Sequence, residues 1–320
     1  MRERLSVPLK GASEWTAALE AFLMSRKVKG VSEETVAWYA KRLKVFVVFA
    51  QKRGETPLTV STKTILEYLR QRLDDVAPPT VNGDLRTLRA FFRFLKREGV
   101  RSDDPTAQVE RVKEPQGMPR TLTDEQVAAL VQAVAKAPPT FVNLRDLALI
   151  CLLLDTGLRV SEACQLRCRD VDLAHGFVRV VGKGKKERMV PFGQTTKVVL
   201  YRYWLRRSAV SVAEEFFFLS AYGRRMTIRV AHTRVRHWFA VAKIMGVKAS
   251  PHTLRYTFVR KWLQSGGDSV VLMRLLGHTS LAMTAYYARL FAMDLKEVHR
   301  RHSPLDALAG TISLPRERLT

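Results

Sequence analysis

A polar stretch about one third of the way along the chain, residues 101–120, limits the fold more than any other part of the sequence. It contains three prolines, and no apolar period of a helix or strand runs through it. Apolar residues at helical spacing lie on both sides, so each side has to bury a hydrophobic core of its own. We therefore expect two domains, residues 1–105 and 121–320, joined by a linker at 106–120.

The first domain has the pattern of four helices. Apolar residues recur at helical spacing within 14–24, after the N-cap candidates Ser32 and Ser61, and after a break at Pro78-Pro79. A row of basic residues follows the polar face of the last helix: Arg86, Arg89, Arg93, Lys96 and Arg97. This row is equally consistent with a solvated surface and with a face that contacts phosphate groups.

The second domain has the pattern of a mainly helical fold with a small sheet. Thr123 and Gln126 form a capping box, and a buried helix is expected around 147–154. The β-branched segment 177–181, a turn rich in Gly and Lys, and the segment 188–191 predict an antiparallel hairpin. Further helices are expected at about 194–206, 227–245, 252–265, 269–276 and 279–302. The fold class is therefore mainly α with a small antiparallel β-sheet.

The charge of the chain points to a nucleic-acid partner. Lys and Arg total 54 against 30 Asp and Glu, a net charge of +24, of which residues 111–320 carry +18. An excess of one sign over so long a segment is typical of a protein that binds a polyanion, DNA or RNA before a membrane surface. Among these charges, a basic stretch from Arg224 to Arg236 is a candidate for the major groove.

Cysteine usage and hydropathy predict the cytoplasm as the compartment. Three cysteines, Cys151, Cys164 and Cys168, cannot form a secreted disulfide framework, and no Cys or His pair nearby completes a zinc site. We interpret them as small buried hydrophobic residues. No secretory signal is expected, and the longest apolar run, 147–154, is far shorter than the roughly 20 residues of a membrane span. We expect no membrane partner, no metal and no cofactor.

Six residues of the second half form a set suited to phosphoryl transfer: Arg159, Lys183, His252, Arg255, His278 and Tyr287. Two arginines can bind the non-bridging oxygens of a phosphodiester, and a lysine can protonate a leaving alkoxide. Histidines can relay protons or stabilise the transition state, and a tyrosine can attack phosphorus. Taken singly, each residue is more often a surface charge, a turn or part of a core; it is the set that indicates chemistry.

Four segments that contain these residues, TGLRVSE, GKGKKERMVP, HTLRYTF and LLGHTSLAMTAYYA, resemble the tyrosine recombinase (phage integrase) family over nearly the whole chain. The resemblance implies a SAM-like, core-binding N-terminal domain and a catalytic domain that together form a C-shaped clamp on DNA. It also implies that Arg159 and Arg255 hold the scissile phosphate, that Lys183 is the general acid and His252 the base. His278 would support the transition state, and Tyr287 would form a 3′-phosphotyrosine bond.

The resemblance implies an enzyme that needs neither metal nor ATP, acting as a homo-tetramer on two double-stranded DNA sites. Tyr256 departs from the usual pattern, where a second histidine is frequent, and Tyr286 is a rival nucleophile.

The segment after Tyr287 favours integration or excision of a mobile element, with accessory proteins setting direction. The alternatives are Xer-type dimer resolution, nicking and closing of the type IB topoisomerase kind, or a DNA-binding regulator. An apolar stripe in 294–308 is expected to dock on a neighbouring protomer.

Overall fold

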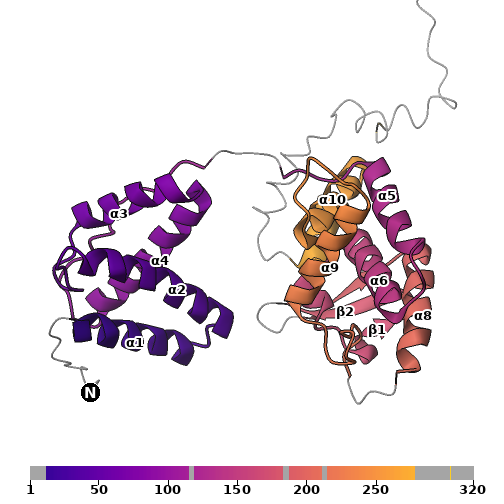
Figure 1. Cartoon of the computed structure of the whole chain (residues 1–320), viewed down its shortest axis with the longest axis horizontal. Helices are drawn as coiled ribbons and strands as arrows, with labels where there is room; N and C mark the ends of the chain where they lie inside the picture. The colour runs from indigo at the N-terminus through magenta and orange to yellow at the C-terminus, as the bar shows by residue number, and fades with distance from the viewer. Residues whose placement is uncertain (1–11, 115–118, 183–186, 211–214, 278–302, 304–320) are drawn as a thin grey trace, which may run out of the picture. The chain divides into compact units, whose positions relative to one another are not determined.

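The computed structural model describes residues 12–114, 119–182, 187–210, 215–277 and 303, and the structural statements below concern these residues. Its internal contacts divide the chain into two compact units, Met1–Gly117 and Met118–Thr320. Helices dominate both units, and the second also contains a small sheet (Figure 1). The expected fold class, mainly α with a small antiparallel sheet, is confirmed.

The first unit consists of four helices, α1 (Ala12–Val28), α2 (Glu33–Gln51), α3 (Thr62–Asp75) and α4 (Pro78–Arg97). Both predicted N-caps are present: Ser32 accepts from the backbone N–H of Thr35, and Ser61 forms a capping box with Thr64. Pro78 and Pro79 start α4 instead of merely breaking the chain, because the first helical positions need no N–H donor. Aromatic rings fill the core, among them Phe22, Phe46, Phe91 and Phe92.

Most of the basic row on α4 is bound within the first unit. Arg89 donates to the carbonyl of Val109, Arg93 pairs with Asp104 at 3.7 Å, and Arg97 pairs with Glu98 at 2.6 Å. The guanidinium of Arg86 instead stacks over a tryptophan ring, 4.8 Å from its centroid. The bond of Arg89 to a backbone carbonyl favours a structural role for this arginine, whereas Arg93 and Arg97 are largely exposed and form only surface ion pairs.

The second unit contains α5 (Asp124–Ala135), α6 (Phe141–Thr156), α7 (Val160–Ala163), β1 (Val171–Asp172), β2 (Phe177–Val181), β3 (Glu187–Pro191), α8 (Gln194–Ser208), α9 (Ile228–Val241), α10 (Pro251–Gln264) and α11 (Ser269–Leu276). A short 3₁₀ helix, Cys168–Asp170, precedes β1. The strands form one antiparallel sheet in the order β1-β2-β3, with Val178 opposite Val190. The two-residue strand β1 is too short to show a sequence pattern and was not predicted. The helix expected at 279–302 lies outside the described residues.

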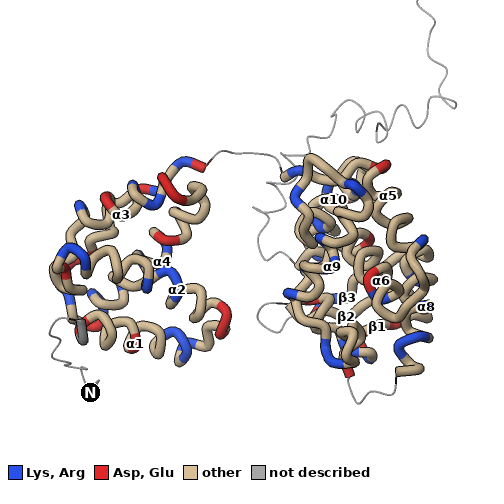
Figure 2. The backbone as a smooth tube through the Cα atoms, in the orientation of Figure 1, with Lys and Arg blue, Asp and Glu red and all other residues tan. Residues whose placement is uncertain are grey.

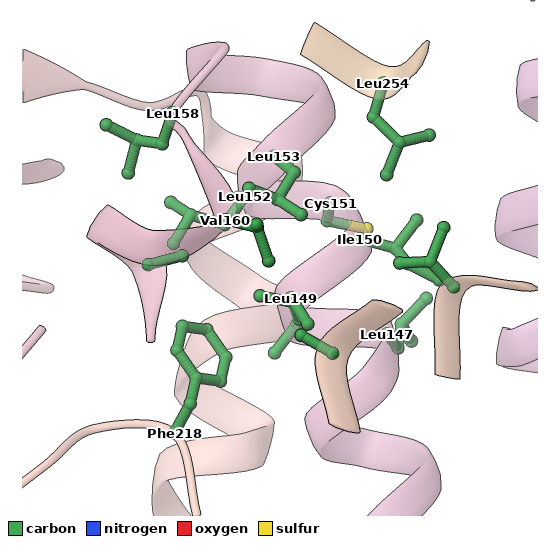
Figure 3. Close-up of a cluster of buried hydrophobic side chains, with 14 of the residues drawn as sticks. Leu147, Leu149, Ile150, Cys151, Leu152, Leu153, Leu158, Val160, Phe218 and Leu254 are labelled. Atoms are coloured by element: carbon green, nitrogen blue, oxygen red, sulfur yellow. The ribbon is translucent and has the colours of Figure 1, made fainter. Parts of the chain in front are cut away.

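Helix α6 forms the centre of the second core. Its side chains from Leu147 to Leu153 are buried on every side, and they meet Leu158, Phe218 and Leu254 (Figure 3). A helix that is apolar all round has to be surrounded by other elements, and here α5, α8 and α10 pack against it.

The three cysteines are free thiols. Burial raises the pKa of Cys151 to about 12 and that of Cys164 to about 11, so both behave as small hydrophobic residues, as predicted. Cys168 differs, because its side chain is only partly buried.

Lys and Arg residues are distributed along both units (Figure 2). Among the helices described here, none is long and apolar enough to cross a membrane.

Candidate active site

Arg159 is placed by a turn that only glycine fits. Helix α6 ends at Gly157, which has φ +62°, and a Cβ at that position would lie 2.3 Å from Cδ1 of Phe258. The chain then turns so that Arg159 becomes the N-cap of α7. The side chain of Arg159 is 42 % exposed, so its guanidinium is accessible from solvent.

Arg159 and Arg255 come together although they are far apart in the sequence. Nη1 of Arg159 lies 3.4 Å from the carbonyl oxygen of Leu276, and Nη2 of Arg255 donates to the same oxygen at 3.1 Å. Nη1 of Arg255 also donates to the carbonyl of Gly157 at 2.5 Å. Arg255 is largely buried, whereas the side chain of Arg159 is more exposed. The structure therefore places two guanidinium groups side by side at the C-terminal end of α11.

A buried carboxylate, Glu162, lies beside this pair. It accepts from the backbone N–H of Arg159 at 2.8 Å and from its Nη1 at 3.1 Å. Arg188 on β3 binds both carboxylate oxygens at 3.0 Å. Burial by itself would raise the pKa of Glu162, but the hydrogen bonds and charge of Arg188, together with Arg159, hold this pKa below its usual value.

His252 lies near the start of α10, on the same helix as Arg255. Partial desolvation lowers its pKa, and His232, Arg255 and Arg159 lower it further by charge repulsion. His252 lines a cavity of about 810 Å³ with Arg120, His232, Arg236, Lys248 and Tyr256. The lining residues that the structure describes are basic, polar or apolar, with no acid among them. A histidine with a lowered pKa beside these basic residues is suited to accept a proton close to a bound phosphodiester.

The other three residues of the predicted set, Lys183, His278 and Tyr287, lie outside the described residues, as does the tail at 294–308. The structure therefore brings together Arg159, Arg255 and His252. Within the ranges that the structure describes, no group of three or more His, Cys, Asp or Glu side chains is arranged to hold a metal ion.

Only part of the basic stretch 224–236 is exposed. Arg234 donates to the buried carboxylate of Asp146 at 2.5 Å, and Nε1 of Trp238 donates to the same oxygen at 2.8 Å. Arg225 stacks on the ring of Phe216, 4.9 Å from its centroid. Arg224, Arg225, Arg229 and Arg236 are exposed, whereas His232 and Arg234 are only partly exposed. Arg234 is therefore the arginine of this stretch that the fold uses internally, and the other four stay candidates for contact with a groove.

Sequence reasoning assigned no role to Glu162 or Arg188, and it placed His232 only in the basic stretch 224–236. Glu162 could have been found from the sequence, because an acid at the third position of a helix can accept from the backbone N–H of the N-cap residue, here Arg159. The sequence indicates a role for Arg188 more weakly, through the presence of a charged residue within a strand. No signal in the sequence places His232 beside His252, because that neighbourhood depends on the packing of α9 against α10.

Comparison with known proteins gives matches to both parts of the chain. The model described as "Phage integrase family" matches residues 120–293, and that described as "Phage integrase, N-terminal SAM-like domain" matches residues 19–99. The chain is 35% identical over 296 residues to "Tyrosine recombinase XerD" of Proteus mirabilis, which covers 89% of this chain and 92% of the relative.

Two solved structures share the fold. A XerH site-specific recombinase bound to a palindromic difH substrate gives a TM-score of 0.74 at 20% identity, over 90% of this chain and 85% of the other. The Tn1549 transposon integrase in complex with transposon right end DNA gives 0.72 at 19% identity, over 91% and 99%. Their similar scores mean that the fold alone does not separate a Xer-type protein from a transposon integrase.

Proposed function

Because this chain belongs to the phage integrase family of tyrosine recombinases, we propose that it cleaves and rejoins double-stranded DNA at specific sites through a 3′-phosphotyrosine intermediate. The observation that carries the proposal is the convergence of Arg159 and Arg255 at the carbonyl of Leu276, with His252 on the same helix as Arg255. Paired guanidiniums offer the directed donors that bind two non-bridging phosphate oxygens.

The proposed reaction exchanges one phosphate ester for another. The phenolic oxygen of Tyr287 attacks phosphorus and its proton passes to His252, while the bond from phosphorus to the 5′ oxygen breaks. Lys183 gives its proton to that leaving oxygen, and His278 with the two arginines stabilises the pentacoordinate transition state. The phosphotyrosine keeps the energy of the phosphodiester, so the 5′-hydroxyl of a second strand can reverse the reaction without ATP.

The biological role we propose is Xer-type dimer resolution. Sequence reasoning favoured a mobile element, but relatives named XerD or XerC, about a third identical, cover 86% or more of this chain. This favours the alternative reading. The family resemblance adds a homo-tetramer assembled on two DNA sites. Accessory proteins that set direction and a tail that docks on the neighbouring protomer stay part of the proposal.

Two assays on one preparation test the function. We expect the protein to recombine a plasmid that carries two copies of a dif-like site from the same genome. Relaxation of a supercoiled plasmid without exchange would instead indicate nicking and closing of the type IB kind. Binding without either reaction would indicate a DNA-binding regulator, and exchange only at the ends of a mobile element would restore the first reading.

Cleavage is expected to continue in excess EDTA. In the proposed mechanism, arginine, lysine and histidine side chains supply the charge that divalent cations supply in metal nucleases. The measurement is covalent protein–DNA adduct on a nicked suicide substrate, with and without EDTA and without ATP. Loss of the adduct in EDTA and its return with magnesium would reject metal independence.

As the pH is lowered, we expect the rate of adduct formation to stay constant until the pH is below about 6.5, the ordinary pKa of histidine. The pKa of His252 is lowered in the free protein, so its neutral, proton-accepting form persists to lower pH than usual. Under subsaturating DNA, the rate reports groups of the free protein. His252→Gln should remove this acid limb, whereas His237→Gln, an exposed histidine on α9, should keep it. A limb centred above pH 6.5 would contradict the prediction.

A further inference from the structure

Arg188 lies outside the predicted catalytic set, yet all three nitrogens of its guanidinium are hydrogen-bonded. It is the second residue of β3, and its side chain is 12 % exposed. Nε donates to the carbonyl of Leu275 at 2.8 Å, and Nη1 and Nη2 donate to the two oxygens of Glu162 at 3.0 Å each. All three guanidinium nitrogens are therefore used to join β3, α7 and the last turn of α11.

The C-terminal end of α11 is shaped around this side chain. Gly277 follows the helix with φ +66°, and a Cβ there would lie 2.8 Å from Nη1 of Arg188. Three guanidiniums, those of Arg188, Arg159 and Arg255, lie at the carbonyls of Leu275 and Leu276. The C-terminal end of a helix carries partial negative charge, which favours cations there.

The charges show what Arg188 does for its neighbour. Glu162 is buried and binds Arg159, so without a second partner its negative charge would be balanced by Arg159 alone. A phosphate would then compete with Glu162 for the same guanidinium. Arg188 binds both oxygens of Glu162 in parallel, the strongest arrangement for this pair of groups. Arg159 is thereby held in place while its charge stays available to an incoming anion.

We propose that Arg188 is a positioning residue for DNA cleavage, which acts through Glu162 to keep Arg159 oriented and available to the scissile phosphate. The inference rests on the proposed function, because it assigns a task in that reaction. Its bond to Leu275 gives it a second connection, from β3 to the segment that leads to Gly277. Loss of the contact with Glu162 and loss of the contact with Leu275 should both lower the rate of cleavage more than the affinity for DNA, because Arg188 itself is nearly buried.

The central variant is Arg188→Gln, measured by covalent adduct on a nicked suicide substrate at saturating DNA. We expect the rate to fall by about 10–100-fold, since small displacements of a positioning group cost up to roughly 10² in rate. The affinity for a single DNA site should change by less than about threefold, because affinity depends mainly on exposed phosphate contacts. Arg179→Gln is the matched control: this arginine on β2 pairs with Asp170 at 2.9 Å and should leave the rate unchanged.

The double variant Glu162→Gln/Arg188→Gln separates positioning from a purely structural role. A glutamine at position 162 keeps an oxygen that can accept from Arg159 but loses the negative charge that competes with phosphate for it, so we expect the double variant to cleave faster than Arg188→Gln alone. If Arg188 only held the fold together, losing a second buried hydrogen-bonding group would leave the rate equal or lower. Thermal unfolding of each variant shows which fraction is folded, and rates are compared per folded protein.

Arg188→Lys covers the case in which the glutamine variant does not fold. One ammonium keeps the charge but cannot bind two carboxylate oxygens and a carbonyl in one plane, so we expect an intermediate rate. A wild-type rate in Arg188→Lys, or in folded Arg188→Gln, would overturn the inference, as would a double variant no faster than the single one. Failure of the wild-type protein to form any adduct would instead reject the proposed function.

Discussion

Tyr287→Phe is expected to form no covalent adduct with DNA while binding a single DNA site as tightly as the wild-type protein. The substitution removes only the phenolic oxygen, which is the nucleophile in the proposed reaction. The arginines and histidines that would contact phosphate remain. The measurement is adduct on a nicked suicide substrate, resolved in a denaturing gel, beside a binding titration of the same preparation.

Tyr286→Phe is the matched control, because it removes the same atom from the adjacent residue. We expect it to form adduct at close to the wild-type rate. If instead Tyr286→Phe lost the adduct and Tyr287→Phe kept it, the nucleophile would be Tyr286. Adduct in both single variants would mean that neither tyrosine is required.

Arg255→Lys should lower the cleavage rate by about 10²–10³-fold, the cost of removing one positioned donor from a transition state. Arg255 donates to the carbonyls of Gly157 and Leu276 with two different nitrogens, and a single ammonium cannot replace both. A buried carbonyl that loses its partner costs about 1–3 kcal/mol, so the free energy of unfolding should fall by a similar amount. Single-turnover cleavage and thermal unfolding measure the two effects.

Arg260→Lys is the control for Arg255→Lys. It lies on the same helix, α10, but its guanidinium donates to Thr121 at 2.7 Å and to Gln264 at 3.1 Å. We expect wild-type cleavage from this variant. Equal rates in Arg255→Lys and wild type, with both proteins folded, would remove Arg255 from the proposed transition-state contacts.

Local signals in the sequence predicted most of the helices correctly. Ser32, Ser61 and Thr123 start helices because their side-chain oxygens satisfy backbone N–H groups that have no helical partner. The hairpin of β2 and β3 followed from β-branched residues on either side of a Gly-rich turn. The start of α4 at Pro78 was missed, because a pair of prolines also indicates a break in the chain. The strand β1 was missed, because two residues are too few to show an alternating pattern.

The candidate site was less accessible to sequence reasoning. The set of six residues indicated phosphoryl transfer, and the structure places three of them, Arg159, His252 and Arg255, near one another. The arginines of 224–236 looked alike in the sequence, yet Arg234 is bound to a buried aspartate and Arg236 is exposed. Exposure depends on which helix face meets the core, and the packing of α9 on α6 decides that.

The sequence by itself determined where many of the helices begin and which residue types are available for chemistry on a polyanion. Those properties depend on contacts within a few residues or on composition. Only the tertiary structure decided that Arg188 binds Glu162 and the end of α11, because these groups come from three segments distant in the chain. A buried carboxylate must find a cation to offset its desolvation, and only the folded arrangement selects Arg188, on β3, for that position.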